Sequence, residues 1–441
     1  MTDAPRASDR PPRSAPWWLA VRGGAVSFAY VALGALAIGV MEWLAAGRPF
    51  GLRLPWKLAG LYIGAFHGAG VQATSTGLFG VGATDGVGEV VNTADTTLHV
   101  TFLLGTALVL FVTGRAGRRV ADRADGGWGR RIAWGSAVAP SYALPIFAVS
   151  LVVVLRFPSA AVTDVRTVAW EALVRSFLVA AGAGGVGGFL SARADLEPPS
   201  RWAARAVAWV VGGWRMTVAL LVLAFAGFLV VAAVQTDAST AYARFATGSA
   251  TGEIVAGHHV LLLPNQSFLI AVPAMGGCVE LGGGSSSQPT TLCLREVTLR
   301  PGWTDLLFPR TPGGEVVRLS PAWLLFLLVP GLATVWGGRA AALGAGSAGE
   351  RALRGAGAGG VFAALTAAGV AASAISVRSG QELIGLRADV GRTAALGLAW
   401  GVIGGVLGAV CLGRPQTGGV VPAAGSDAEP EPEEPPSPTS E

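Results

Sequence analysis

Eight apolar stretches constrain the fold of this chain more strongly than any other feature of its sequence. A helix needs roughly 20 apolar residues to cross a bilayer core of ~30 Å. The stretches that meet or approach this length lie at about 22–46, 97–114, 132–155, 168–191, 206–235, 321–338, 358–377 and 392–412. We therefore predict an all-α fold: a polytopic transmembrane helical bundle of about eight spans, with the lipid bilayer as its main partner.

The composition agrees with a membrane protein. Charged residues make up 13% of the chain, where a soluble protein carries about a quarter. The pI is about 9.6, but much of the basic charge lies in short segments that flank the apolar stretches, where it is a topology signal. We therefore expect no nucleic-acid partner. The first apolar stretch is far longer than the ~7 to 15-residue core of a signal peptide, which predicts a retained span.

Arginines in short loops orient the spans. The basic segments are the N-terminal tail and loops that carry Arg115, Arg118, Arg119, Arg123, Arg130 and Arg131, then Arg193, Arg201 and Arg205, then Arg339, Arg351 and Arg354. All of them fall on one side of the membrane if eight stretches span. This predicts a multi-pass protein of the cell membrane with cytoplasmic N- and C-termini, although short outer loops also carry some arginines.

Two further apolar segments, 55–73 and 256–276, are interrupted by glycine, histidine or proline. If either segment crossed the membrane, every later loop would invert and some basic clusters would face outward. We therefore interpret both as re-entrant or interfacial segments on the outer side.

With this assignment the chain contains the same four-span plan twice. The first four-helix repeat covers 22–191 and contains the re-entrant candidate 55–73. A cytoplasmic linker, 192–205, leads to the second repeat, 206–412, which contains the re-entrant candidate 256–276 and an outer hairpin loop at 277–320. An even number of spans per repeat gives both repeats the same orientation, as parallel repeats. The alternative is a coincidence in a low-complexity apolar chain.

Local sequence supports the repeat. Gly-Arg-Ala occurs at 114–116 and at 338–340, and Asp164–Thr167 resembles Asp389–Thr393. The apolar runs 61–71 and 268–278 both end in closely spaced glycines. The tails differ from these repeats: we predict disorder for 1–21 and for the acidic, proline-rich segment 413–441 in the cytoplasm.

Four residues are candidates for lining a pathway between the repeats: His67, Pro264, Asn265 and Gln266. Pro264 and Asn265 are expected to break the helix, because proline lacks a donor and asparagine can bond the freed backbone. Paired broken segments are typical of transporter binding sites. The alternative is an outer amphipathic helix or a packing wedge that only caps the bundle.

Charged and histidine residues offer weaker candidates. Glu171 and Arg175, four residues apart, form a predicted intramembrane charge pair that is either structural or functional. His67, His258 and His259 lie in or beside the re-entrant candidates, but their spacing matches no metal motif, so we predict no metal site and no cofactor.

Cys278 and Cys293 flank a Gly/Ser-rich turn, which predicts a β-hairpin in the outer loop. Because the outer compartment is oxidising, we expect a disulfide between them, with free thiols as the alternative.

Glycines four residues apart predict close helix crossings, at Gly184 and Gly188 and again at Gly401, Gly404, Gly405 and Gly408. The sequence contains no G-x-S-x-G, P-loop or H-E-x-x-H motif and no set of nucleophile, base and orienting residue. We therefore expect that the protein is not an enzyme.

The run LLLPNQSFLIAVPAMGGCVELGGG and the later span AWLLFLLVPGLATVWGGRA resemble a pattern in uncharacterised multi-pass membrane proteins of GC-rich actinobacteria. The resemblance covers about half of the chain. It implies a similar topology and transfers no activity.

Two function hypotheses follow. The first is a permease-like or channel-like protein with its pathway between the two repeats. The second is a non-transporting membrane scaffold or regulator of cell-envelope processes that acts through its outer loops. The sequence identifies neither a solute nor a protein partner.

Overall fold

The computed structural model describes residues 16–45, 51–76, 93–156, 162–195, 200–234, 250–282, 290–293, 326–379 and 382–413. Its helices are α1 (Trp17–Ala45), α2 (Arg53–Ala65), α3 (Leu103–Ala121), α4 (Trp128–Ser136), α5 (Ala139–Val152), α6 (Ala169–Asp195), α7 (Arg201–Val234), α9 (Ala250–Ala274), α12 (Leu328–Ala341), α13 (Ala348–Ser373) and α14 (Val390–Cys411). Its strands are β1 (Val71–Thr76), β2 (Thr93–His99), β3 (Val154–Arg156), β4 (Val162–Thr167), β5 (Cys278–Gly282), β6 (Thr290–Cys293), β7 (Ile375–Ser379) and β8 (Glu382–Ala388).

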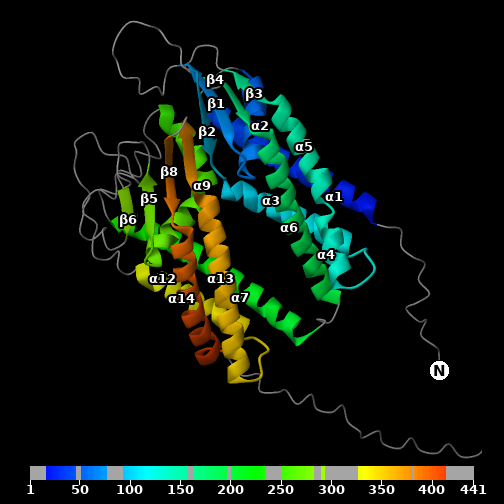
Figure 1. The fold of residues 1–441 in the computed structure, drawn as a ribbon, viewed down its shortest axis with the longest axis vertical. Helices are drawn as coiled ribbons and strands as arrows, with labels where there is room; N and C mark the ends of the chain where they lie inside the picture. Colours follow the sequence, from blue (N-terminus) through cyan, green and yellow to red (C-terminus); the bar gives the residue numbers. More distant parts are fainter. Residues whose placement is uncertain are drawn as a thin grey trace, which may run out of the picture.

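The described fold is mostly helical, and one eight-stranded antiparallel sheet covers one end of it (Figure 1). The strand order is β3-β4-β1-β2-β7-β8-β5-β6. Threonine and valine recur in these segments, and β-branched residues favour strands. The sequence analysis predicted strands only at the Cys278–Cys293 hairpin, so the sheet is an addition to the predicted helical fold. We call this end of the molecule the sheet end and the opposite end the far end.

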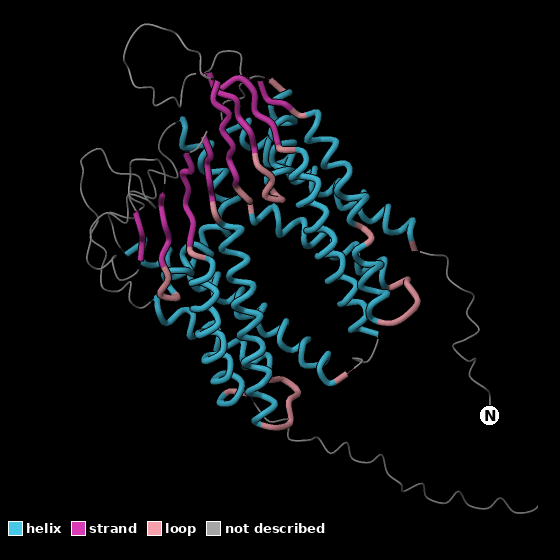
Figure 2. Tube along the Cα trace, in the orientation of Figure 1, coloured by secondary structure: helices cyan, strands magenta, loops and turns pink. Residues whose placement is uncertain are grey.

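The helices extend from the sheet in two groups (Figure 2). Among the described residues, six segments are long and apolar enough to cross a membrane: α1, α4 with α5, α6, α7, α13 and α14. Large apolar side chains are exposed along them, such as Tyr30, Leu151 and Ile403. A chain with this surface belongs in a lipid bilayer, so the protein is an integral membrane protein.

The described elements follow the same order in the two halves of the chain. Each half has a long helix, a helix that leads into two strands, a helix, a helical segment, two further strands and a last helix. Gly68 and Gly276, with φ of +72° and +91°, end the helix before the first strand in each half. The sheet joins the halves through β2 and β7, where Thr96–His99 pair with Ser376–Ser379.

Close contacts between glycines hold three helices together in each half, as the four-residue spacing predicted. A Cβ atom on Gly117 of α3 would lie 2.5 Å from the carbonyl oxygen of Gly184, and one on Gly135 of α4 would lie 2.3 Å from it. In the second half, a Cβ on Gly338 or Gly355 would lie 2.2 or 2.4 Å from the carbonyl oxygen of Gly405. Only glycine permits this approach of the backbones.

These contacts correct two local correspondences predicted from the sequence. Gly117, not Gly114 of the Gly-Arg-Ala motif, takes the place that Gly338 takes in the second half. Asp164–Thr167 lie within β4, whereas Asp389 is the N-cap of α14 and accepts a hydrogen bond from the amide of Arg392. Short motifs of common residues therefore gave a register that the packing does not follow.

The predicted helix break at Pro264 and Asn265 is wrong. The helix α9 runs continuously from Ala250 to Ala274 with both Pro264 and Pro273 inside it. A proline removes one helical hydrogen bond, which helices in membrane proteins tolerate when their neighbours satisfy the freed groups. The other candidate segment, 55–73, contains most of α2 and the start of β1.

The linker is shorter than predicted, because α6 extends to Asp195 and α7 begins at Arg201. The helix α1 begins at Trp17, inside the segment predicted as a disordered tail. Residues 1–15, 414–441 and much of the hairpin loop 277–320 lie outside the described residues.

The glycine contacts generate a stability prediction. Replacing Gly184 by Ala places a Cβ 2.3 Å from the carbonyl oxygen of Gly135, so we expect G184A to lower stability by about 1–3 kcal/mol and to lower the Tm of the purified protein. The control is G182A on the same helix, where no atom lies within 4 Å of the new Cβ. We expect its Tm to be unchanged or higher, because alanine favours helices. Equal Tm values for the two variants would contradict the predicted packing.

Candidate functional site

Two turns at the base of the sheet bring together four of the residues singled out in the sequence: His67, Glu171, Arg175 and Asn265. The first joins α2 to β1 and the second joins β2 to α3. The Thr106 hydroxyl donates to the Phe66 carbonyl at 2.5 Å, and the Phe102 amide donates to the Ala65 carbonyl at 3.3 Å. A Cβ on Gly68 would lie 2.5 Å from the Thr101 hydroxyl, so this contact also requires glycine. We call this region the polar junction.

Glu171, in the first turn of α6, is the central charge of the polar junction. Its Oε2 accepts a hydrogen bond from the Gly70 amide at 3.1 Å. The same oxygen lies 3.5 Å from Arg175 Nη2 and 3.7 Å from His99 Nδ1. The side chains of Glu171, Arg175 and His99 are 31%, 47% and 35% exposed. Glu171 and Arg175 therefore form a partly exposed ion pair, and Glu171 also fixes the turn before β1.

His67 is buried behind this charge cluster. Its Nδ1 lies 2.7 Å from the Ile63 carbonyl, and its Nε2 lies 2.9 Å from the Tyr142 hydroxyl. Because a carbonyl only accepts, Nδ1 carries the proton and Nε2 accepts from Tyr142. Burial lowers the pKa of His67 to about 4, and the hydrogen bond to Ile63 opposes this shift only in part. His67 is thus a neutral, fully used side chain at neutral pH.

A second buried polar pair lies nearby on α1 and α2. The Tyr62 hydroxyl donates a short hydrogen bond to Glu42 Oε2, and both residues are buried. The sequence analysis did not single out Tyr62 or Tyr142. A tyrosine in an apolar run gives no signal of its own, because the partner that satisfies its hydroxyl is distant in the sequence.

Asn265 links the second half of the chain to the first. This residue of α9 is buried, and its Nδ2 donates to the Thr101 carbonyl at 2.6 Å while its Oδ1 accepts from the Leu103 amide at 3.1 Å. The side chain therefore caps the start of α3. The sequence analysis had predicted that it would instead bond the backbone of its own helix. Pro264 and Gln266, its neighbours on α9, are half-buried.

The other site candidates lie apart from the polar junction or outside the description. His258 and His259 are in α9, and their side chains lie outside the described residues. Within the part of the chain that the structure describes, no group of three His, Cys, Asp or Glu residues is arranged to hold a metal ion. Cys278 is disulfide-bonded and lies opposite Cys293 in the β5–β6 register. Of the described cysteines, Cys411 is free.

The polar groups of the junction have apolar or differently charged counterparts in the second half. His67 directly precedes Gly68, the positive-φ glycine that ends α2, whereas apolar Met275 directly precedes the corresponding Gly276 of the second half. The third residue of the last helix is Glu171 in the first half and Arg392 in the second. At these two positions the polar groups therefore belong to the first half alone, and they are the site candidates of that half.

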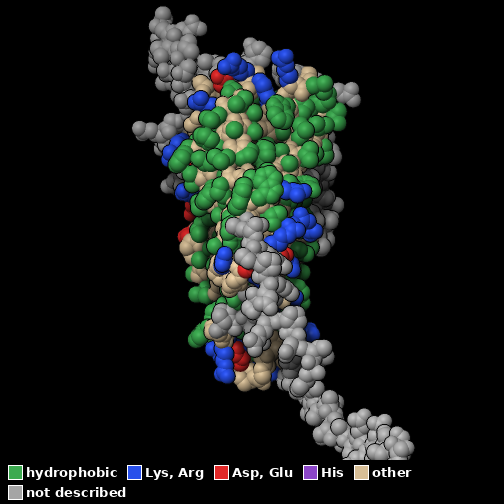
Figure 3. Space-filling model, turned by 90° about the vertical axis from the view of Figure 1, so that its right-hand side faces the viewer, with side chains coloured by type: hydrophobic (Ala, Val, Ile, Leu, Met, Phe, Trp, Pro, Cys, Tyr) green, Lys and Arg blue, Asp and Glu red, His purple; other side chains and the backbone are tan. Residues whose placement is uncertain are grey.

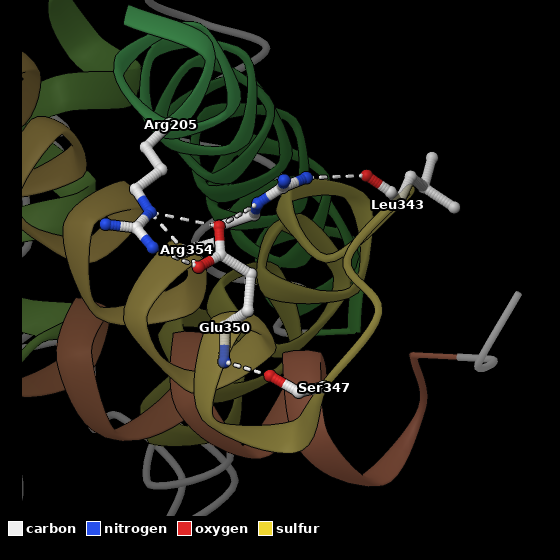
Figure 4. A network of polar contacts seen from close by, with 5 residues as sticks. All are labelled: Arg205, Leu343, Ser347, Glu350 and Arg354. Carbon is white, nitrogen blue, oxygen red and sulfur yellow. Dashed lines mark hydrogen bonds and ion pairs between the residues drawn. The ribbon is translucent and has the colours of Figure 1, made fainter. Parts of the chain in front are cut away.

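The far end of the second half carries a different polar network (Figure 4). Glu350 accepts hydrogen bonds from Arg205 Nη2 at 2.7 Å and from Arg354 Nε at 2.9 Å, and its amide is capped by Ser347. Arg354 also donates to the Leu343 carbonyl at 3.0 Å. One carboxylate thus neutralises arginines of α7 and α13 and joins these two helices.

The burial of His67 generates a pH prediction. An unfolded histidine has a pKa near 6.5, whereas folded His67 takes up its proton only near pH 4. The unfolded state therefore binds more protons between these values, so stability is full above pH 6.5 and falls as the pH drops toward 4. We expect the Tm of the purified protein to fall over this window and H67Q to lessen the fall. The half-exposed His99 provides the control, because H99Q should retain it. If the Tm of H67Q fell as much as that of the unmodified protein, burial would not lower the pKa of His67. That result would mean that water reaches this side chain.

The chain matches no protein-family model, no curated protein and no solved structure.

Proposed function

We propose that this protein is a non-transporting membrane scaffold of cell-envelope processes, which presents its sheet on the outer side of the cell membrane. The observation that carries the proposal is the continuous sheet. Backbone hydrogen bonds between β2 and β7 tie the two halves together at the sheet end. Rocking of one half against the other, which alternating access needs, would have to break or bend this sheet.

The proposal includes eight spans arranged as two parallel four-helix repeats. All strands lie in one sheet, so α3 must carry the chain from β2 to the far end before α4 and α5 return it to β3. By the same argument the chain must run to the far end between β6 and α13, and α12, with 14 residues, is the described helix of that segment. The helix α3 has 19 residues, about 28 Å of helix, which is enough to cross the bilayer core. These two helices add to the six candidate spans.

The orientation rests on the arginines. Arg118 and Arg119 in the last turn of α3 and Arg339 in the last turn of α12 lie at the far end. The positive-inside rule then places the far end and both termini in the cytoplasm. The sheet end faces outward, where the disulfide of Cys278 would also be stable.

The proposed pathway residues support a structural role. Asn265 and His67 are buried, and each makes two hydrogen bonds within the protein. A vestibule would need such groups to face water. The exposed groups lie instead on the sheet, where Arg387 forms an ion pair with Glu280 and Arg156 one with Asp164. These side chains offer a polar surface for a protein partner.

The test is photo-cross-linking in living cells. A photoreactive amino acid at Arg387, whose side chain is 60% exposed, should give one discrete protein adduct. The same amino acid at exposed Arg130, on α4 at the far end, is the control for nonspecific capture and should not give that adduct. Identical adducts at both positions, or none at Arg387 and at Arg156 of the sheet, would contradict a scaffold that acts through its outer face.

The second candidate is a permease-like or channel-like protein. The observation that favours it is the half-exposed cluster of Glu171, Arg175 and His99, for which the described residues of the second half show no equivalent set of charges. In this case the polar junction would be the outer end of a pathway between the repeats. It would require His67 to exchange with water, so the pH dependence described above distinguishes the two functions.

A further inference from the structure

A groove between α1 and α3 is apolar over one part of its length and basic over the other. Its volume is about 840 Å³. The apolar part is formed mainly by Val26, Tyr30, Leu108, Phe111 and Val112, and the small residues Gly23, Ser27, Gly34 and Ala116 leave room between the helices. Tyr30 and Phe111 are 59% and 65% exposed, so the groove opens to the surface that faces lipid.

Four arginines form the basic part of the groove. Arg115, Arg119 and Arg123 lie on or just beyond α3, and Arg22 lies on α1. The four-residue spacing of the first three places them on one face of the chain. All four are exposed. Figure 3 shows a group of Lys and Arg side chains that borders a broad hydrophobic surface on this side of the molecule.

These arginines have no acidic partner in the described part of the chain. The ion pairs there involve other arginines, and Asp122 and Asp125 in the loop after α3 form none with them. The far end of the second half differs, because Glu350 neutralises Arg205 and Arg354 there (Figure 4). Like charges spaced four apart on a helix are destabilising, so the groove is complementary to an anion.

The dimensions of the groove define the anion. From Leu108 to Arg119 the helix advances 11 residues, about 16 Å, and the apolar part comes before the arginines. One leaflet has a hydrocarbon depth of about 15 Å. We propose that this groove binds an anionic phospholipid of the leaflet at the far end, with its acyl chain between Tyr30 and Phe111 and its phosphate at Arg115, Arg119 and Arg22. The proposal is independent of the scaffold function.

The side chains that line the groove indicate whether the bound phosphate group belongs to a phospholipid or is a free ion. A free phosphate would be held by the arginines alone, whereas a phospholipid also covers the apolar side chains beside them. Basic pockets between helices at a membrane surface are suited to anionic headgroups, and each arginine near the surface contributes to the attraction. Binding of a phospholipid therefore depends on the apolar part of the groove, whereas binding of free phosphate does not.

The test uses the full-length protein and native mass spectrometry. The purified protein, in detergent, is titrated with phosphatidylglycerol and, in parallel, with phosphatidylcholine. We expect phosphatidylglycerol to be retained preferentially and R115Q/R119Q to weaken its binding about thirty-fold. The matched control is R118Q/R130Q, which removes the same charge from exposed arginines of α3 and α4 that do not line the groove. It should leave binding within about threefold.

Two further arms identify the ligand. V26W fills the apolar part without changing charge, and we expect it to weaken phosphatidylglycerol binding as well. Inorganic phosphate at millimolar concentration should not displace the lipid. An equal loss in both double variants would overturn the proposal, because it would indicate general attraction to a basic surface. Full displacement by phosphate, or unchanged binding in V26W, would overturn the lipid as the occupant. Unchanged Tm values in phosphatidylcholine show that each variant is folded.

Discussion

The backbone hydrogen bonds between β2 and β7 are the interaction on which the architecture depends. Each half of the chain contributes four strands, and the pairing of Thr96–His99 with Ser376–Ser379 joins them into one sheet. The segments that connect the helices at this end have polar backbone groups that need partners near a membrane. The sheet provides these partners. It also constrains the directions of the helices that its strands connect, because both ends of each such connection lie at the sheet.

Below the sheet, the helices associate through glycine rather than through large apolar side chains. Lipid offers little hydrophobic drive for helices to associate, so close backbone packing must supply the attraction. Gly184 meets Gly117 and Gly135, and Gly405 meets Gly338 and Gly355. The rest of the helix surface is thereby free to carry large apolar side chains toward lipid, as Phe111 and Leu178 do. Small residues along α1 likewise leave room for the groove between α1 and α3.

Six of the eight predicted spans correspond to long apolar helices of the structure. They could be predicted from the sequence because hydropathy is a local property, and the membrane class followed from it. The glycine crossings were also predictable, because their spacing repeats within one helix. The sheet was not. Its strands are three to seven residues long, they adjoin apolar helices, and β2 pairs with a strand about 280 residues away. Such short, half-polar segments carry no clear period, so only the hairpin around Cys278 could be found.

The candidate site, too, could be predicted only in part from the sequence. His67, Asn265, Glu171 and Arg175 were selected as unusual polar residues in apolar surroundings, and the structure gathers them at the turns of the polar junction. Their roles were not predictable. Asn265 was expected to bond the backbone freed by Pro264, yet it caps α3 from 162 residues away. A polar side chain near a proline can bond any segment that packs against it. The sequence alone does not show which segment that is.

Cysteine accessibility in intact cells tests the central claim, that one sheet holds all of the connecting strands on the outer side of eight spans. In a C411S background, cysteines are placed singly at exposed positions: Arg387 in β8 and Ser347 at the start of α13. The account predicts that a membrane-impermeant maleimide labels R387C in intact cells, but labels S347C only after permeabilisation. Labelling of both positions from outside, or of S347C alone, would contradict the account, because the sheet and the arginine-rich far end would then not lie on opposite sides of the membrane as proposed.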